Sequence, residues 1–410
     1  MATSDRGKLL LVIPTVVEQS GQHLLLDGDF SNNVEAYLRE FDSVTVACPA
    51  RRQTGTFPST RDPEDVAGSE RLNLIVLPEP YREDRYIARR GEVKRILREQ
   101  IESADYILIS PHAAFDWSTL AAEMCIDLKK KYNMEADWNL PQVTNYIWSQ
   151  MPFGPNKLRK LVWQKYHTPK YFRCLRNSSL ALVQGEDVYN EYKRIAPNIF
   201  PVLNIQVTDK DKISHENLAR KTAAVRQGAP LKIVYAGRAA EMKGPMEWLG
   251  VLDILRGKGI EFNATWFGGG ELLDEMQGVV QDRGLTSCCE LSGNADREAV
   301  FSALQSADMF LFCHMTKESP RCLVEALAAG APLIGFGTDY SRSLVRQAGG
   351  GAFVERGDVE GLAEIVEHYA LNRNELVDLI VQAAASGDRL DRDTAISERI
   401  SLMKQYLKAD

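Results

Sequence analysis

Short apolar runs with strand character alternate with amphipathic, helix-like segments along most of this chain of 410 residues. A parallel strand needs a long crossover before its neighbour, so this alternation predicts an α/β fold with parallel sheets covered by helices. In the first half the predicted strands are 9–13, 43–47, 72–77, 106–109, 142–144 and 180–183. In the second half they are 232–236, 263–267, 290–292, 309–312, 333–335 and 352–354.

The length of the chain exceeds what one hydrophobic core usually serves, so we expect two domains. A polar and charged stretch, residues 206–230, separates the two series of strand and helix patterns. We therefore place a linker at 206–230, between a first domain of residues 1–205 and a second domain of residues 231–393.

The composition is that of a soluble globular enzyme, with 44% hydrophobic and 26% charged residues and a formal net charge of −7. A nucleic-acid-binding domain is usually basic, so we expect no nucleic-acid partner. No apolar run approaches the roughly 20 residues that cross a bilayer, and the N-terminus lacks a signal-peptide pattern. The seven cysteines are odd in number and contain no C-x-x-C spacing. These observations predict a cytoplasmic protein with reduced thiols.

Two charged motifs each follow a predicted strand of the second half. The string GRAAEMKG places Arg238 and Lys243 where a helix should begin, and the string KESPRCLVEALAAG places Glu318 and Glu325 at another strand-to-helix turn. Cations beside a helix N-terminus bind phosphate, and a carboxylate at such a turn accepts hydrogen bonds from sugar hydroxyls. Together the two motifs predict a pocket for a sugar joined to a nucleoside diphosphate.

These strings resemble the donor site of retaining glycosyltransferases of the GT-B fold, in particular glycosyltransferase family 4 (glycosyl transferases group 1). The resemblance covers the second half of the chain well and the first half in outline. It implies two Rossmann-like, doubly wound domains that face a central cleft. The first domain would bind the acceptor and the second the nucleotide-sugar donor. It also implies a last helix, within residues 394–410, that crosses back to the first domain.

The activity implied by the resemblance is that of a retaining hexosyltransferase using a UDP-sugar or GDP-sugar. The acceptor would be a glycan, a lipid-linked molecule or a natural product, in bacterial polysaccharide or glycoconjugate synthesis. In this family the residues matching Arg238 and Lys243, beside Gly237, grip the departing diphosphate. The phosphate oxygen itself takes the acceptor proton, so no protein nucleophile, cofactor or metal is expected.

The second motif departs from the family pattern in its spacing. The family has seven residues between its two Glu, whereas six separate Glu318 from Glu325, and Lys317 stands at the position counted back from Glu325. We assign Glu318 to the sugar and Glu325 to the ribose hydroxyls. The alternative is a pair of surface carboxylates, but Glu325 lies in an apolar run where an unpaired charge is costly. The other donor-binding residues expected in this turn are Ser319, Arg321, Cys322 and Leu323.

Two further candidates follow other predicted strands. Gly268 and Gly269 begin a glycine triplet, and glycine permits close approach of the backbone to a ligand. The alternative is a flexible turn. His112 follows the strand at 106–109, at the sheet edge where ligands of open α/β sheets bind. The family often has a histidine near the donor sugar there, so we count His112 as catalytic, against the alternative of a histidine bonded to backbone.

Two basic stretches, residues 81–98 and 157–176, stand out against the acidic whole. A basic amphipathic face can lie on anionic lipid, which predicts peripheral contact with the inner face of the membrane. The alternatives are a solvated basic helix or a site for a soluble phosphorylated acceptor.

Three other functions remain open from the residues. One is a nucleotide-sugar epimerase of the same fold, and another is a pseudo-enzyme or regulatory subunit that binds nucleotide sugar. The shortened Glu spacing favours the pseudo-enzyme. A nicotinamide dehydrogenase is the least favoured, because no G-x-G-x-x-G string follows the first strand.

Overall fold

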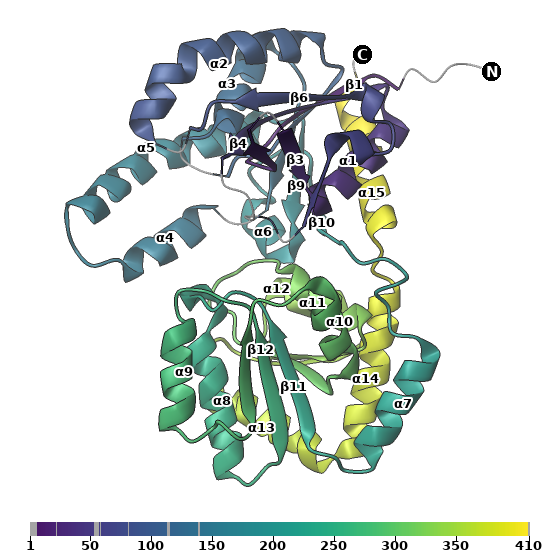
Figure 1. Ribbon diagram of the computed structural model, residues 1–410. Coiled ribbons are helices and arrows are strands. Elements are labelled where there is room, and N and C mark those ends of the chain that lie inside the picture. The colour runs from purple at the N-terminus through teal and green to yellow at the C-terminus, as the bar shows by residue number, and fades with distance from the viewer. Residues whose placement is uncertain are drawn as a thin grey trace. The chain divides into compact units, whose positions relative to one another are not determined.

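The computed structural model describes residues 6–21, 23–52, 57, 59–80, 82–112, 115–137 and 140–408. The chain divides into two compact units, unit 1 comprising Met1–Leu203 with Asp393–Asp410, and unit 2 comprising Asn204–Arg392. Each unit contains one sheet with helices packed around it (Figure 1). The N-terminal part of the chain and the last helix therefore belong to the same unit.

The strands of unit 1 are β1 (Lys8–Val12), β2 (Val17–Ser20), β3 (His23–Asp27), β4 (Ser43–Arg51), β5 (Thr60–Arg61), β6 (Leu72–Leu77), β7 (Tyr106–Ile109), β8 (Asn133–Ala136), β9 (Leu180–Gln184) and β10 (Ile199–Val202). They are ordered β10-β9-β8-β7-β1-β4-β2-β3-β5, and β6 also pairs with β4. The pairs β2–β3 and β3–β5 are antiparallel, and the others are parallel.

The helices of unit 1 are α1 (Gly28–Glu40), α2 (Glu83–Ser103), α3 (Trp117–Leu128), α4 (Leu140–Gln150), α5 (Pro155–Asn177), α6 (Gly185–Tyr192) and α15 (Arg392–Leu407), with short 3-10 turns η1 (Pro63–Asp65) and η2 (Ser69–Arg71). Helix α15 buries Ile396, Ile400, Met403 and Leu407 against the same core as β1. Its Lys404 also pairs with Glu40 at the end of α1, at 2.6 Å.

The strands of unit 2 are β11 (Leu231–Ala236), β12 (Phe262–Phe267), β13 (Cys289–Gly293), β14 (Met309–Phe312), β15 (Leu333–Phe336) and β16 (Gly351–Val354). All are parallel, in the order β13-β12-β11-β14-β15-β16. The helices are α7 (His215–Arg226), α8 (Pro245–Gly257), α9 (Leu273–Asp282), α10 (Arg297–Ser306), α11 (Arg321–Ala328), α12 (Asp339–Val345), α13 (Val359–Leu371) and α14 (Arg373–Asp388), with the 3-10 turn η3 (Glu241–Lys243).

The strands β14 and β15 are apolar throughout because both of their faces are covered. Every residue of β14 and of β15 is buried, as expected for parallel strands between two helix layers. Side-chain caps fix the starts of several helices: Asp296 accepts from the Ala299 N–H at α10, and Asp358 accepts from the Gly361 N–H at α13.

Two sequence predictions differ from the structure. Residues 142–144, predicted as a strand, lie inside α4. The preceding Pro141 has no N–H to donate to a sheet, whereas the first turn of a helix does not need that donor. Residues 206–230, predicted as a linker, contain α7 and belong to unit 2. The many charged residues of α7 made the segment resemble a linker, although it is a helix whose start is capped by Ser214.

Candidate active site

The strand order of unit 2 creates a point where the chain direction across the sheet reverses. From β11 the chain continues to β12 and β13 on one side, and from β14 it continues to β15 and β16 on the other. The strands β11 and β14 are hydrogen-bonded neighbours. In open α/β sheets, ligands bind outside the carboxyl ends of the strands at such a switch point. Both charged motifs of the sequence follow these two strands.

An ion pair joins the two motifs across the switch point. Lys243 Nζ lies 2.8 Å from Glu318 Oε1, and their side chains are only 11% and 12% exposed. The loop that carries Lys243 is held against the end of β14 by Gly244, whose φ is 65°. A Cβ at Gly244 would lie 2.0 Å from the Cys313 carbonyl oxygen, so only glycine fits there. The structure therefore brings Lys243 and Glu318 together, as the two-motif prediction requires.

The residues next to this ion pair include Arg238 and Lys317, which the sequence analysis also considered. Arg238 is exposed and makes no ion pair within the part of the chain that the structure describes. Lys317 is also exposed, whereas Glu318 is turned into the site. The geometry thus agrees with choosing Glu318 as the inward carboxylate. Contact of Arg238 or Glu318 with a ligand stays a prediction.

Helix α11 begins beside the pair with no side-chain cap, because its N-cap residue is Pro320. The Leu323 N–H already donates to the Pro320 carbonyl at 3.3 Å, so it is less suited to a ligand than the sequence suggested. The Cys322 side chain is largely enclosed, and burial raises its pKa to about 12. The thiol therefore stays protonated near neutral pH and is a poor nucleophile.

Glu325 is held by a residue that sequence reasoning missed. Arg297, at the start of α10, lies 3.4 Å from Glu325 Oε1 and 3.1 Å from Asp211 Oδ1. Its guanidinium also donates to the Gln206 carbonyl at 3.3 Å. Arg297 thus fixes the direction of Glu325 from a neighbouring helix. No spacing in the sequence links the two, since 27 residues separate them.

The glycine triplet packs against the loop after β11. The Ala239 N–H donates to the Gly269 carbonyl at 2.9 Å, and the Gly237 N–H donates to the Phe267 carbonyl at 2.8 Å. A Cβ at Gly268 would lie 2.1 Å from the Gly237 oxygen, and Gly268 has a φ of 126°. The glycines therefore permit two loops to approach each other, a reason the sequence did not indicate. Their contact with a donor stays a prediction.

Gly268→Ala is expected to destabilise unit 2 by at least about 2 kcal/mol, because it adds a backbone clash to an unfavourable φ. The measurement is urea unfolding followed by fluorescence. Gly278→Ala is the matched control, since a Cβ there meets nothing within 4 Å, and alanine in a helix interior is favourable by up to about 1 kcal/mol. Equal stability of Gly268→Ala and wild type would contradict the close packing.

A buried histidine, which sequence reasoning also missed, lies beneath the site. His314 Nε2 is 2.9 Å from the Tyr235 hydroxyl, and both side chains are buried. Burial, with a smaller effect from Lys243, holds the pKa of His314 well below its usual range. Burial also raises the pKa of Tyr235 well above its usual value. The pair is therefore neutral and supports the loops rather than transferring protons. Its signal was the polar residue directly after an apolar strand.

His112 lies at the end of β7 in unit 1 and is exposed. Its N–H donates to Asp116 Oδ2 at 2.6 Å, and Asp116 also caps α3 by accepting from the Thr119 N–H at 2.8 Å. The loop after β7 is thus fixed at the carboxyl edge of its sheet, where the prediction placed His112. Its role beside a donor sugar stays a prediction.

A groove of about 1210 Å³ opens at the carboxyl ends of β4 and β6, beside α2. Its lining includes apolar residues such as Leu77 and Pro78, and two arginines, Arg51 and Arg52, at the end of β4. Neither arginine forms an ion pair with another residue in the described ranges. This is a candidate acceptor groove within unit 1.

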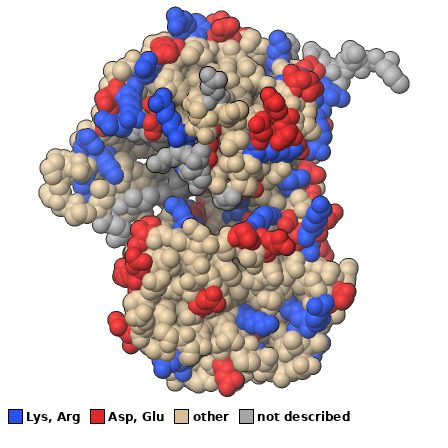
Figure 2. All heavy atoms as spheres, in the orientation of Figure 1, with Lys and Arg blue, Asp and Glu red and all other residues tan. Residues whose placement is uncertain are grey.

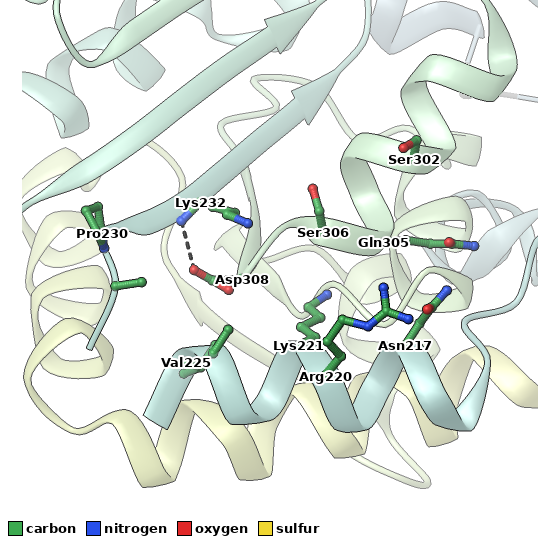
Figure 3. A pocket seen from close by; sticks show the side chains of 12 residues that line it. Asn217, Arg220, Lys221, Val225, Pro230, Lys232, Ser302, Gln305, Ser306 and Asp308 are labelled. Atoms are coloured by element: carbon green, nitrogen blue, oxygen red, sulfur yellow. Dashed lines mark hydrogen bonds between the residues drawn. The ribbon is translucent and has the colours of Figure 1, made fainter. Parts of the chain in front are cut away.

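A cavity of about 310 Å³ lies at the opposite, amino edge of the unit 2 sheet (Figure 3). It is lined by α7, α10 and the first residues of β11. Lys221 projects from α7 into this region and donates to the Gly330 carbonyl at 2.7 Å, just beyond the end of α11. Asp308 accepts from the Lys232 N–H at 2.9 Å. The bond from Lys221 ties α7 to the end of the helix that carries Glu325, on the side away from the switch point.

Residues 220–386 match the family model described as glycosyl transferases group 1. Unit 2 is a domain of that family. The amylovoran biosynthesis glycosyltransferase AmsK of Erwinia amylovora is 27% identical over 162 residues, which are 38% of this chain and 40% of AmsK. A second curated relative matches over 60% of its own length. The chain thus spans less than two thirds of either relative.

Two solved structures have the same fold as the whole chain. HepE of Anabaena, solved in complex with UDP, has a TM-score of 0.65 and 16% identity, covering 97% of this chain and 99% of HepE. Sucrose-phosphate synthase of Thermosynechococcus elongatus has a TM-score of 0.69 and 14% identity, covering 97% and 98%. The expectation of a GT-B fold is therefore confirmed.

Proposed function

We propose that the protein is a retaining glycosyltransferase that moves a hexose from a nucleoside-diphosphate sugar to a glycan, lipid-linked or natural-product acceptor. Its pathway would be bacterial polysaccharide or glycoconjugate synthesis. The observation that carries the proposal is the Lys243–Glu318 pair, 2.8 Å apart at the switch point of a group 1 domain. The biosynthetic assignment of AmsK and the UDP bound to HepE support a nucleotide-sugar donor.

The proposed chemistry breaks the bond from the anomeric carbon to the diphosphate and forms a bond to the acceptor oxygen on the same face. The acceptor proton goes to the departing phosphate oxygen. Arg238 and Lys243 bind the diphosphate and stabilise the charge that it gains as it leaves. Glu318, released from full pairing with Lys243, accepts from sugar hydroxyls, and Glu325 accepts from the ribose. Arg297 keeps Glu325 in position.

Donor binding is the first test of this proposal. A thermal-unfolding panel of uridine, guanosine and adenosine diphosphate sugars should show one stabilising donor. At about 100 times its Kd, such a donor adds roughly 2.7 kcal/mol to the stability. We expect the shift to be lost in Glu325→Ala and kept in Glu364→Ala, an exposed carboxylate on α13. Transfer is expected to continue in EDTA, because the two cations replace a divalent ion.

The outcomes of this panel separate the candidate functions. No shift with any donor would contradict the proposal. A shift without turnover on any acceptor would favour a nucleotide-sugar-binding regulator, in which the nearly buried ion pair serves binding alone. Conversion of the donor sugar without an acceptor would favour an epimerase.

Contact with an anionic membrane through residues 81–98 and 157–176 is part of the proposal. Tyr81 lies outside the described residues. Within the described part, no helix is both long and apolar enough to cross a bilayer. The arginines of this first stretch largely pair with carboxylates, as in Arg82–Asp84 at 3.0 Å and Arg89–Glu92 at 3.1 Å. The stretch 81–98 is therefore a partly neutralised surface, and the second stretch is the better candidate.

A further inference from the structure

The first half of helix α5 contributes no buried residue to the core of unit 1. Its buried residues are Tyr171, Cys174 and Leu175, all in the second half of the helix. Pro169 lies inside the helix just before them. In Figure 1, α4 and the first half of α5 extend away from the sheet of unit 1. This hairpin presents a surface that packing of unit 1 does not explain.

The outer surface of the hairpin is strongly apolar. Nine large hydrophobic side chains are exposed in the described ranges, and five of them lie between positions 153 and 166. Phe153 is 90% exposed, and the other four are between 43% and 61% exposed: Leu158, Leu161, Val162 and Tyr166. On a helix, positions 158, 161, 162 and 166 form one stripe. We call these five residues the 153–166 surface. So many exposed apolar residues in one place mark a binding surface.

The stretch of sequence that carries this surface has charges of one sign. Between Asp137 and Glu186 the sequence contains seven Lys and Arg residues and no acidic residue, in a chain of net charge −7. The basic residues are Lys157, Arg159, Lys160, Lys165, Lys170, Arg173 and Arg176. In Figure 2, Lys and Arg lie beside the uncharged end of the projecting hairpin. Two of these basic residues pair with carboxylates of neighbouring helices, Arg159 with Glu83 at 3.9 Å and Lys170 with Glu123 at 3.4 Å. The other cations leave an excess of positive charge beside the apolar stripe, which complements an anionic lipid surface.

The hairpin is also internally fixed, so the apolar stripe is not a consequence of loose folding. Lys157 Nζ donates to the carbonyls of Ser149 and Met151 at 3.1 and 3.0 Å, which closes the turn after α4. On the inner side of α5, the Trp163 ring packs on Phe115 with centroids 4.7 Å apart. The outer residues therefore face away from a side that is already packed.

We propose that the 153–166 surface docks on membranes containing anionic lipid, with the five apolar side chains in the headgroup region and Arg159 and Lys165 against lipid phosphates. An interfacial helix of this kind lies in the plane of the membrane, about 5–10 Å deep. The surface would hold unit 1, with its candidate acceptor groove, at a lipid-borne acceptor. The proposal rests on the proposed function only for that acceptor, and the binding test needs no catalysis.

The test is co-sedimentation of the full chain with vesicles of phosphatidylcholine alone and with 30% phosphatidylglycerol. We expect binding to the anionic vesicles only, weakened by salt. Arg159→Gln with Lys165→Gln should lower the partition coefficient about 25-fold, at about fivefold per cation near an anionic surface. Leu158→Ser with Val162→Ser should lower it at least about tenfold.

The matched control is Leu371→Ser with Val381→Ser, which removes two exposed apolar side chains from unit 2. It should bind vesicles as the wild type does. Each variant must keep the wild-type unfolding curve. Absence of binding to anionic vesicles overturns the proposal, as does equal loss in the control. Concentration-dependent self-association that Leu158→Ser with Val162→Ser abolishes, without vesicle binding, would assign the surface to a second copy of the chain.

A second measurement reports insertion directly. Phe153→Trp places a fluorophore at a site that is 90% exposed. We expect brominated lipids in anionic vesicles to quench the added fluorescence, relative to wild type with its own tryptophans. Leu371→Trp should show no added quenching. Quenching at 371 but not at 153 would overturn the proposed orientation. Loss of vesicle binding with intact donor binding would leave the glycosyltransferase proposal standing.

Discussion

Lys243→Met is expected to lower kcat/KM for glycosyl transfer by about 100- to 1000-fold, the range seen when one fixed charge-stabilising donor is removed. Lys243 Nζ lies at the switch point where the diphosphate would leave, and its side chain is only 11% exposed. Removal of the ammonium also leaves the Glu318 carboxylate without its partner in a largely enclosed site. The measurement is initial rates with the donor found in the thermal panel.

The control for this variant is Lys258→Met. Lys258 also forms an ion pair in unit 2, with Glu367, but its side chain is 36% exposed and it lies at the end of α8 opposite to Lys243. We expect its kcat/KM to stay within about twofold of wild type, as for most surface ion pairs. If Lys243→Met is as active as Lys258→Met, then Lys243 does not act on the leaving group.

A double variant separates catalysis from folding. If the Lys243–Glu318 pair only supports the loops, Lys243→Met with Glu318→Gln should regain both stability and activity, because no buried charge is left alone. If the pair binds the donor, the double variant regains stability and remains inactive. Regained activity would therefore contradict the proposed chemistry.

The sequence predicted the elements whose signals are local. Both faces of β14 and β15 are covered, so each appears in the sequence as an unbroken apolar run. The two charged motifs could be placed because each follows such a run. Glu318 was chosen over Lys317 from the resemblance to the family's two-Glu motif, although the spacing is one residue short.

The parts that were missed depend on contacts between distant segments. Arg297 contacts Glu325 only because α10 and α11 pack side by side. No sequence spacing predicts this contact. The same holds for His314 and Tyr235: Tyr235 lies in β11, and His314 follows the adjacent strand β14. Helix α7 was predicted as a linker because most of its residues are polar or charged. It buries only a few residues, and one of them, Lys221, is itself charged.

The stability of unit 2 is expected to depend on pH because of Lys221, and this is the second prediction with a large effect. Its side chain is buried in α7 and donates to the Gly330 carbonyl at 2.7 Å. Burial lowers the pKa of Lys221 from 10.5 to about 7, an effect opposed by nearby Asp308 and increased by Lys232. Between these two pH values the unfolded chain binds a proton that the folded chain does not, so folding becomes more favourable as the pH rises.

We therefore expect wild type to gain about 2 kcal/mol of stability relative to Lys221→Met between pH 7 and 8.5, at 1.36 kcal/mol per pH unit. The difference should level off about one pH unit below the folded pKa, where Lys221 is charged in both states. The comparison with the variant matters because the buried thiols, such as Cys313 with its raised pKa, lower stability as the pH rises. Urea unfolding at each pH gives the two curves, and Lys258→Met should run parallel to wild type.

Parallel curves for wild type and Lys221→Met would mean that the hydrogen bond to Gly330 keeps the buried ammonium charged, and that the cavity beside it contains a permanent cation.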